Sequence, residues 1–455
     1  MAVCPIDTGR YGSKEIREIF SEEGRLRYLL KVEAALAKAL GEAGVIPTEA
    51  AEAVEKTALS DRVKLSRVKE IEARTRHDLV AVVEALAEMC GDHGGYVHWG
   101  ATSNDIIDTA WALMLRDALK IVEQRLAACI EVLMQLAEKH VNTIMPGRTH
   151  GQHASPITLG FKFAVYAAEL ARDLERLQEL KKRLIVGKLS GAVGTMAALG
   201  EKAFEVEKKF MEILGLKPAE ITTQVVCRDR FAELILWCAL TGSSLDRIAT
   251  EIRNLQRTEI LEVAEGFERE QIGSSAMPHK QNPIDCEKIS GLAKVLRGFT
   301  TPALENIPLW HERDLTNSSS ERFAIPLSVI ILEEMLETME RVLRNLRIYP
   351  ENMARNLEMS KGMIFSEALT MALARGGMSR LEAHRLVREL SLKAIKEDKH
   401  LREVAMEDPR ISSILPEEEI DEVFEAEKQL SNVPKLVERA LTYAMRTLQR
   451  TLKDA

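Results

Sequence analysis

The residues best suited to chemistry lie in one loop-forming stretch, residues 273–283, which reads GSSAMPHKQNP. Glycine, serine, proline and asparagine interrupt regular structure, whereas the surrounding sequence has the pattern of helices. The stretch offers hydroxyl groups at Ser274 and Ser275, the cation of Lys280 and the amide of Asn282. Such a loop is suited to holding an anionic substrate and removing a proton from it. The alternative interpretation is an ordinary loop rich in glycine and serine.

A histidine in a predicted turn is the second candidate. His150 lies in residues 146–152, PGRTHGQ, where a proline and two glycines predict a turn that displays the side chain. Because imidazole titrates near neutrality, His150 is suited to act as a general acid. The alternatives are a surface histidine or a metal ligand together with His153. Two histidines without a third ligand make a poor metal site, so we expect no bound metal.

A charged segment lies within a helix that we predict over residues 67–89. Its Arg76, His77 and Asp78 have the chemistry to grip a dianionic group. The alternative is a solvated helical turn.

A hydroxyl-rich stretch follows His98. Thr102 and Ser103 read as a loop leading into a helix, and helix N-termini attract anions. The alternative is a helix cap with no binding role.

Two arginines nine residues apart, Arg313 and Arg322, have Ser318 between them. This set could clamp a phosphate, or form a salt-bridge cluster at the start of a helix. The glycine-rich stretch 187–200 lacks the spacings of nucleotide-binding loops, so we interpret it as a tight turn.

Long helices must position these groups. Apolar residues recur at alternating spacings of four and three over residues 106–140 and 234–255, and more loosely over 163–184. This rhythm keeps one apolar seam facing a partner helix and predicts a bundle. The first helix would reach roughly 50 Å. Helices of that length usually pack across subunits, so we expect an oligomer.

The helices predict an all-α fold in three parts. Residues 1–105 read as shorter helices, residues 106–350 as a central long-helix bundle, and residues 351–455 as shorter, more polar helices. A chain of 455 residues exceeds what a single core usually serves. No alternation of apolar and polar residues is long enough to predict a sheet.

Composition narrows the class of protein. The balance of 46% hydrophobic and 29% charged residues is that of a soluble globular protein, and a net charge of −8 argues against a nucleic-acid partner. The uncharged stretches fall short of the ~20 residues needed to span a membrane, and the N-terminus does not read as a secretory signal. Six cysteines without a CxxC pair predict free thiols in a reducing cytoplasm.

Together these segments resemble the adenylosuccinate lyases of the fumarase/aspartase superfamily, from Arg10 to Arg322. The stretch around Ser274 and the Thr102-Ser103 pair are shared by several branches of that superfamily. The adenylosuccinate branch is indicated by three motifs, TRHD at 75–78, GRTHG at 147–151 and WHERD at 310–314.

Two residues depart from the pattern of that family. Gln281 stands where Arg or Val is common, and His153 stands where proline is often seen. Residues beyond about 350 carry no matching motif, so the resemblance there is only one of helical content.

The resemblance implies a β-elimination that releases fumarate from adenylosuccinate and from its imidazole-carboxamide precursor, SAICAR. It assigns the base to Ser274, the general acid to His150, a partner of that histidine to Glu287, and the orientation of the succinyl-purine region to His77. The binding residues that it implies are Arg10, Tyr11, Arg76, Asp78, His98, Thr102, Ser103, Gln224, Ser275, Lys280, Asn282, Lys288, Arg313, Ser318 and Arg322.

The resemblance also implies a cytoplasmic homotetramer whose active sites each draw on three subunits, with no metal and no organic cofactor. The alternatives are another member of the superfamily, such as a carboxymuconate cycloisomerase or an argininosuccinate lyase, or an inactive structural homologue. The two-arginine cluster argues against the first pair, because their substrates bear no phosphate. Retention of Ser274, His150, Lys280, Asn282 and Glu287 argues against an inactive homologue.

Overall fold

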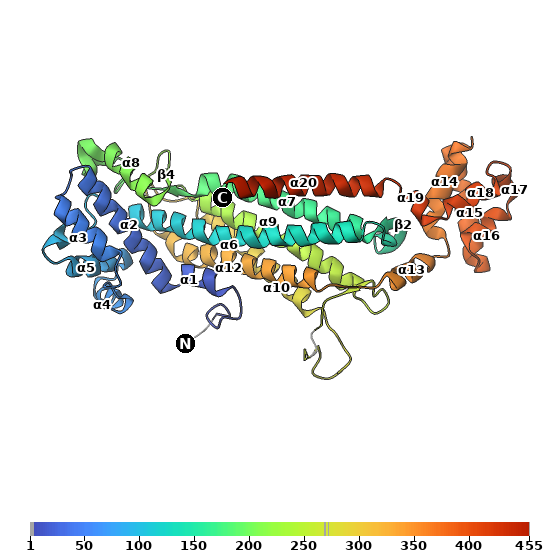
Figure 1. Ribbon diagram of the computed structural model, residues 1–455, viewed down its shortest axis with the longest axis horizontal. Coiled ribbons are helices and arrows are strands. Elements are labelled where there is room, and N and C mark those ends of the chain that lie inside the picture. The colour runs from blue at the N-terminus through green and yellow to red at the C-terminus, as the bar shows by residue number, and fades with distance from the viewer. Residues whose placement is uncertain (1–3, 268–269, 272, 455) are drawn as a thin grey trace. The chain divides into compact units, whose positions relative to one another are not determined.

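The computed structural model describes residues 4–267, 270–271 and 273–454, and it has the all-α architecture that the sequence predicts (Figure 1). The contacts within the chain divide it into two compact units, each built from three separate stretches. The division into 1–105, 106–350 and 351–455 stays a prediction, because the units follow contacts and not chain order. Unit 1 comprises Met1–Arg125, Asp173–Ser243 and Gly291–Glu337, and unit 2 comprises Leu126–Arg172, Ser244–Ser290 and Thr338–Ala455.

Unit 1 contains a cluster of shorter helices near the N-terminus, drawn in blue in Figure 1. Apart from the first of them, their apolar faces share with that of α8 one hydrophobic core that includes Leu36, Leu40 and Phe210. The elements are α1 (Lys14–Phe20), α2 (Glu22–Glu42), α3 (Thr48–Ala58), α4 (Leu65–Thr75), α5 (Asp78–Cys90), η1 (Gly91–Tyr96), η2 (Ala197–Lys202) and α8 (Ala203–Leu214).

The long helices confirm the predicted apolar seams. Leu115, Leu119, Val122 and Leu126 on α6 are each fully buried, as the alternating spacing of four and three requires. The unit boundaries fall within five of these helices. They are α6 (Ser103–Lys139), α7 (Leu159–Leu184), α9 (Asp229–Leu255), α10 (Ile284–Gly298) and α12 (Thr316–Arg344), while the short α11 (Thr300–Glu305) lies wholly in unit 1.

Short strand pairs interrupt the helices. The antiparallel pair of β1 and β2 forms a hairpin whose register is broken between Pro146 and Arg148. This irregularity and the few residues involved explain why no strand was predicted from the sequence. The pairs are β1 (Ile144–Thr149) with β2 (Gln152–Thr158), β3 (Val186–Gly187) with β4 (Lys217–Pro218), and β5 (Val263–Ala264) with β6 (Arg347–Ile348).

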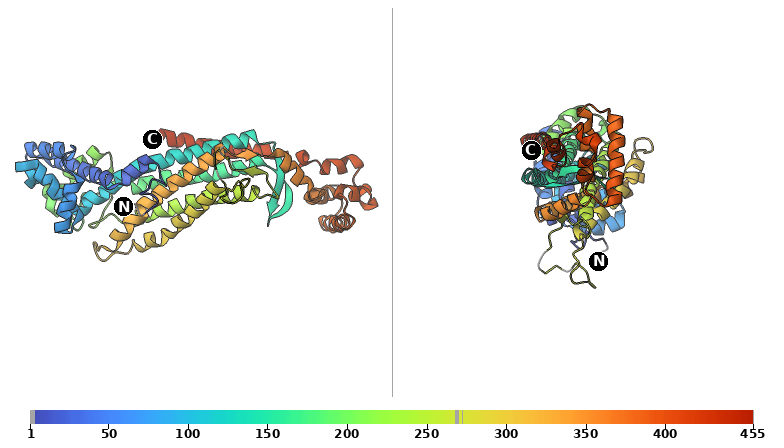
Figure 2. Two further views of the ribbon diagram at one scale, coloured as in Figure 1. Left: turned by 90° about the horizontal axis from the view of Figure 1, so that it is seen from below. Right: turned by 90° about the vertical axis from the view of Figure 1, so that its right-hand side faces the viewer.

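The C-terminal part of unit 2, drawn in orange and red in Figure 2, is made mostly of shorter helices, but its last helix spans 22 residues, which the sequence did not predict. Ser379 caps α15 by accepting a hydrogen bond from the Glu382 N–H. Among the described residues, no helix has the length and apolar character to cross a membrane. The elements are α13 (Pro350–Glu358), η3 (Met363–Phe365), α14 (Ser366–Arg375), α15 (Arg380–Glu397), α16 (Leu401–Met406), α17 (Pro409–Ser412), α18 (Glu417–Val423), α19 (Ala426–Gln429) and α20 (Val433–Asp454).

Candidate active site

The charged segment around His77 lies at a break between two helices. The prediction of one helix over residues 67–89 was wrong, because α4 ends at Thr75 and α5 begins at Asp78. Arg76 adopts a left-handed conformation (φ 54°) and its N–H closes the last turn of α4 on Glu72 O. The His77 ring then caps α5 by accepting a hydrogen bond from Val80 N at 3.3 Å. The break therefore presents three consecutive polar side chains from a junction and not from a helix face.

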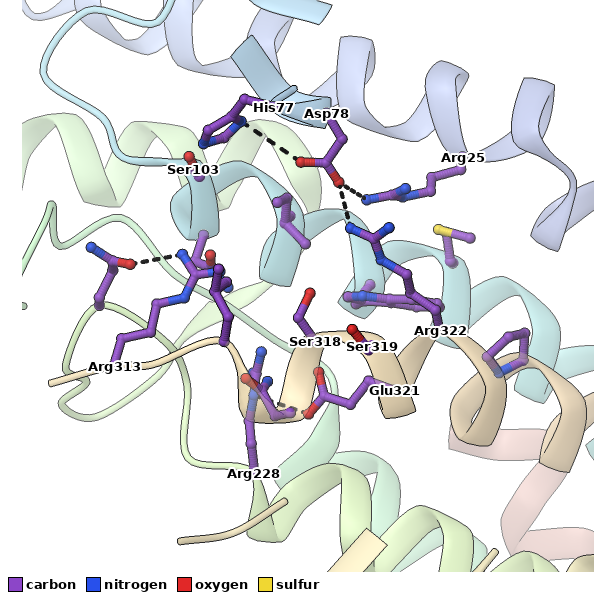
Figure 3. Close-up of a pocket in the computed structure, with 18 of the residues that line it drawn as sticks. Arg25, His77, Asp78, Ser103, Arg228, Arg313, Ser318, Ser319, Glu321 and Arg322 are labelled. Carbon is purple, nitrogen blue, oxygen red and sulfur yellow. Dashed lines mark hydrogen bonds and ion pairs between the residues drawn. The ribbon is translucent and has the colours of Figure 1, made fainter. Parts of the chain in front are cut away.

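A cleft of about 780 Å³ in unit 1 collects many of the predicted binding residues (Figure 3). The α4–α5 junction, the start of α6, the loop before α9 and the start of α12 all contribute to it. Segments far apart in the sequence thus meet in one unit. The predicted residues that line the cleft are Arg76, His77, Asp78, Ser103, Gln224, Arg313, Ser318 and Arg322.

Asp78 joins two arginines at this cleft. Its Oδ2 lies 3.0 Å from Arg25 Nη2 and 3.1 Å from Arg322 Nη2 (Figure 3), and its Oδ1 accepts the Leu79 N–H at 2.8 Å. Burial alone raises the pKa of Asp78, but the two guanidinium groups and the N–H outweigh it and hold that pKa below its usual range. Asp78 is therefore ionised at neutral pH and orients both arginines.

Gln224 orients the second arginine of the predicted phosphate cluster. Arg313 Nη1 donates to Gln224 Oε1 at 2.7 Å, and Gln224 Nε2 donates to Ala192 O at 2.9 Å. Ala192 belongs to the glycine-rich stretch 187–200, which we interpreted from the sequence only as a turn. The structure shows that this stretch supports the cleft.

A buried charge cluster at the base of the cleft was missed from the sequence. Arg228 contacts Asp108 through Nη2 at 3.0 Å and Nη1 at 3.1 Å, and its Nε lies 3.1 Å from Glu321 Oε1. All three residues are at least nine-tenths buried. Burial raises the pKa of Glu321, and the nearby guanidinium of Arg228 opposes that rise. Their only signal in the sequence is position, since Arg228 lies four residues after Gln224 and Glu321 directly precedes Arg322.

The Thr102-Ser103 stretch is fixed by Asp105, another residue that we did not single out. Asp105 accepts hydrogen bonds from Thr102 N at 2.8 Å, from Ser190 N at 2.8 Å and from Gly191 N at 3.1 Å. Its carboxylate is also paired with Lys188 Nζ. One carboxylate thus connects the start of α6 to the stretch 187–200.

His98 has a buried partner. Its Nδ1 lies 2.7 Å from Glu33 Oε1, and the Glu33 side chain is fully buried. Burial by itself lowers the pKa of His98, but the Glu33 carboxylate outweighs it and the pKa is raised. The predicted binding residues Arg10, Tyr11, His98 and Thr102 are not among the described residues that line this cleft.

In unit 2, His150 occupies the turn of the β1–β2 hairpin. His150 and Gly151 both have positive φ angles, 53° and 75°, as two-residue hairpin turns require. The strand below is held by Arg148, whose Nη1 and Nη2 donate to the two carboxylate oxygens of Glu262 at 2.9 and 2.6 Å. The hairpin therefore displays an exposed imidazole above a bidentate ion pair.

The Ser274 hydroxyl lies in a local network. Its Oγ accepts hydrogen bonds from Met277 N at 3.1 Å and from Ala276 N at 3.3 Å. Asn282 Nδ2 donates to Gly273 O at 2.8 Å, and a Cβ on Gly273 would lie 2.1 Å from Lys280 O. Only glycine fits at that close approach. N–H groups directed at a hydroxyl oxygen stabilise negative charge on it.

A second cleft, of about 720 Å³, lies in unit 2. Its lining includes the predicted residues Lys280, Asn282 and Glu287 together with Arg253 and Arg257. This excess of cations over carboxylate suits a substrate with several carboxylates. The predicted residues His150, Ser274, Ser275 and Lys288 are not among its described lining residues.

Within one chain, the described residues include no hydrogen bond that joins His150 to Ser274 or to Glu287. Glu287 lies in the first turn of α10, and its N–H donates to Pro283 O at 2.9 Å. Lys288 Nζ lies 3.8 Å from Asp285 Oδ1.

The long-helix bundle, the Ser274 stretch and the two clefts define a lyase of the fumarase/aspartase class. The model of the family described as "Lyase" matches residues 9–298. The crystal structure of 3-carboxy-cis,cis-muconate lactonizing enzyme from Pseudomonas putida is similar to this fold, with a TM-score of 0.89 and 33% identity. That comparison covers 98% of this chain and 100% of the other.

The sequence comparisons identify the branch. The family described as "Adenylosuccinate lyase C-terminus" matches residues 362–440, a region in which we found no motif. An adenylosuccinate lyase of Pyrococcus horikoshii is 53% identical over 99% of this chain and 100% of its own length. One of Methanothermobacter thermautotrophicus is 49% identical over 98% of this chain and 100% of its own length. The chain belongs to the adenylosuccinate lyase family.

Proposed function

We propose that this chain is a carbon–nitrogen lyase that releases fumarate from adenylosuccinate, giving AMP, and from SAICAR, giving AICAR, in purine nucleotide biosynthesis. The observation that carries the proposal is the full-length identity of 53% to an adenylosuccinate lyase. The arginine-lined cleft of unit 1 supports it, because both substrates bear a phosphate.

The cleft of unit 1 takes the nucleotide end of the substrate. Arg313, Ser318 and Arg322 bind the phosphate, with charge-assisted hydrogen bonds from two guanidinium groups. His98 also contacts the phosphate, and His77 orients the succinyl-purine region. The remaining binding residues that the resemblance implies for this end are Arg10, Tyr11, Arg76, Asp78, Thr102, Ser103 and Gln224.

Proton removal is the first chemical difficulty, because the proton lies beside a carboxylate and is weakly acidic. Ser274 takes this proton as an alkoxide, and the N–H groups of Ala276 and Met277 stabilise the charge on its oxygen. The cation of Lys280 and the amide of Asn282 bind the substrate carboxylates. They also stabilise the doubly charged aci-carboxylate that forms. Ser275 and Lys288 complete the binding of this end.

The leaving amine is the second difficulty. His150 donates a proton to the nitrogen as the carbon–nitrogen bond breaks, and the electron pair of that bond leaves with the nitrogen. Glu287 accepts a hydrogen bond from the other nitrogen of the ring and sets its tautomer. Ser274 and His150 thus exchange protons with the substrate at different atoms, and no metal or organic cofactor takes part.

The assembly that we propose is a homotetramer in the cytoplasm, with each active site drawing on three subunits. One observation supports shared sites: among the described residues of one chain, His150 forms no hydrogen bond to Glu287. The partners are then small-molecule substrates and further copies of this chain.

The test is to mix the purified protein with adenylosuccinate, follow the near-ultraviolet change of the N6-substituted purine and assay fumarate. Ser274→Ala and His150→Ala should each abolish turnover while light scattering still reports a tetramer. His384→Ala, an exposed histidine of α15, is the matched control and should leave the rate unchanged. Near-native activity in either variant removes that residue from its role. Activity on argininosuccinate or carboxymuconate, without activity on adenylosuccinate, assigns the chain to another branch.

A further inference from the structure

The stretch that carries Ser274 connects strand β5 to helix α10. It departs after β5, which pairs with β6 so that Ala264 lies opposite Arg347. It rejoins at α10, which begins at Ile284. The two ends are Glu265 and Gln281.

Arg347 contacts both of these ends. Its Nε donates to Glu265 O at 3.0 Å, and its Nη2 donates to Gln281 Oε1 at 2.6 Å. One guanidinium therefore bridges the departing and the returning chain. A planar group with several fixed donors is needed for this bridge, and a lysine could not reproduce it.

Gln256 contacts the same two residues. It directly follows α9, its Nε2 donates to Gln281 O at 3.0 Å, and its Oε1 accepts the Glu265 N–H at 2.9 Å. Glu265 and Gln281 are thus each held twice, once by Gln256 and once by Arg347. We call these four residues the stem clamp.

The stem clamp also contacts α10, the helix that carries Glu287, through the side chain of Glu265. The Glu265 side chain accepts hydrogen bonds from Asp285 N at 3.2 Å and Cys286 N at 2.6 Å, in the first turn of α10. These N–H groups have no partner within the helix, so Glu265 also caps it. The clamp therefore fixes the ends of the Ser274 stretch relative to α10.

Gln281 is one of the two residues at which this chain departs from the family pattern noted in its sequence. Valine at this position offers no acceptor to Arg347, and arginine would place two guanidinium groups together. The side-chain amide of Gln281 accepts from Arg347 through Oε1, and its backbone carbonyl, which any residue would offer, accepts from Gln256. In this chain, residue 281 therefore has a side chain that can accept the hydrogen bond of Arg347.

We propose that Gln256, Gln281 and Arg347 are positioning residues, which act by holding the stretch that carries Ser274 at the place from which its hydroxyl reaches the substrate. The inference rests on the proposed role of Ser274. It assigns these three residues no contact with the reacting atoms.

The test compares Gln281→Val and Arg347→Ala with the parent protein in steady-state kinetics on adenylosuccinate. Each should lower kcat by about tenfold, because each removes a hydrogen bond to a charged group. KM and the inhibition constant of AMP should change little, because the nucleotide binds in unit 1. The double variant should be no slower than the slower single variant, because the two side chains act through one contact. Gln281→Glu, which keeps an acceptor for Arg347, should restore most of kcat.

Arg344→Ala is the matched control, since Arg344 lies on α12 and pairs with Glu340 outside the clamp. Hydrogen exchange is the second readout and does not depend on turnover. Backbone N–H groups of residues 273–281 should exchange faster in Gln281→Val and Arg347→Ala than in the parent and in Arg344→Ala. Unchanged exchange and unchanged kcat would overturn the proposal, as would a rise in KM alone, which would make Arg347 a substrate ligand. If exchange is faster in Gln281→Val and Arg347→Ala but the Ser274→Ala variant is active, the stem clamp stands and the proposed role of Ser274 is rejected.

Discussion

The side chains of Asp105 and Lys188 form an ion pair that is fully buried on both sides. Asp105 additionally accepts N–H groups of Thr102, Ser190 and Gly191. The further contact of Lys188 Nζ is with Gly191 O at 3.4 Å. Without the lysine, the Asp105 carboxylate would still accept three N–H hydrogen bonds. Without the carboxylate, the Lys188 ammonium would lose its counter-charge.

This asymmetry predicts unequal losses of stability. Asp105→Asn should lower the free energy of unfolding by on the order of 3 kcal/mol, because it leaves a buried cation without its counter-charge. Lys188→Met should cost less, because three N–H donors remain for Asp105. The measurement is denaturant unfolding at one fixed protein concentration. Arg67→Ala breaks an exposed ion pair with Glu88 and should leave the midpoint unchanged. Equal losses in the two buried variants would contradict this account.

The His98–Glu33 pair predicts a pH dependence of stability. Since the folded pKa of His98 is raised above the unfolded value, the pair contributes fully below about pH 6.5. The contribution is lost as the pH rises through the raised pKa. Glu33→Gln should therefore destabilise the protein more at pH 6 than at pH 9, as measured by the unfolding midpoint at both pH values. A loss of the same size at both pH values would argue against the ion pair.

The Arg148–Glu262 pair supports the hairpin that displays His150. Glu262→Gln should lower kcat by about tenfold, because the bidentate contact becomes a weaker one and the imidazole is held less well. KM should change little, because His150 is proposed to act on the leaving nitrogen. Arg148→Lys should not restore the rate, because a lysine cannot contact both carboxylate oxygens. Steady-state kinetics distinguish these outcomes, and a rescue by lysine would show that charge alone is sufficient.

Local patterns in the sequence were enough to predict three of the long helices, α6, α7 and α9, whereas α12 and α20 were not singled out. The seam through Leu115, Leu119 and Val122 is set by residue spacing on a single helix, and all three are fully buried. The break at Arg76 and His77 was not predictable in this way, because the flanking residues keep a helical pattern on both sides. It depends on a left-handed residue and a side-chain cap, which become visible only in three dimensions.

The site was predictable where one segment carries several functional groups. Ser274, Lys280 and Asn282 share one short stretch, so residue type and spacing identify them together. The Arg228–Asp108 pair joins residues 120 positions apart, and neither residue stands in a distinctive motif. The role of the stretch 187–200 was not predictable for a similar reason, since it acts through backbone groups of Ser190, Gly191 and Ala192, which hold Asp105 and Gln224.

Arg322 gives the sharpest test of the proposed division between binding and chemistry. Its side chain is 56% exposed and contacts Asp78 at 3.1 Å. When Arg322 is removed, Asp78 keeps Arg25 and the Leu79 N–H, so the cleft should stay folded. Arg322→Ala should raise KM for adenylosuccinate about tenfold and change kcat by less than about twofold, because a phosphate contact contributes equally to the ground and transition states.

Succinyladenosine, which lacks the phosphate, is the matched control substrate for this variant. The parent protein and Arg322→Ala should process it with the same kcat/KM, because the group that Arg322 is proposed to bind is absent. A similar loss on both substrates would mean that Arg322 acts on the cleft as a whole, through Asp78. An unchanged KM for adenylosuccinate would remove Arg322 from the phosphate site and leave Arg313 as the cation to test there.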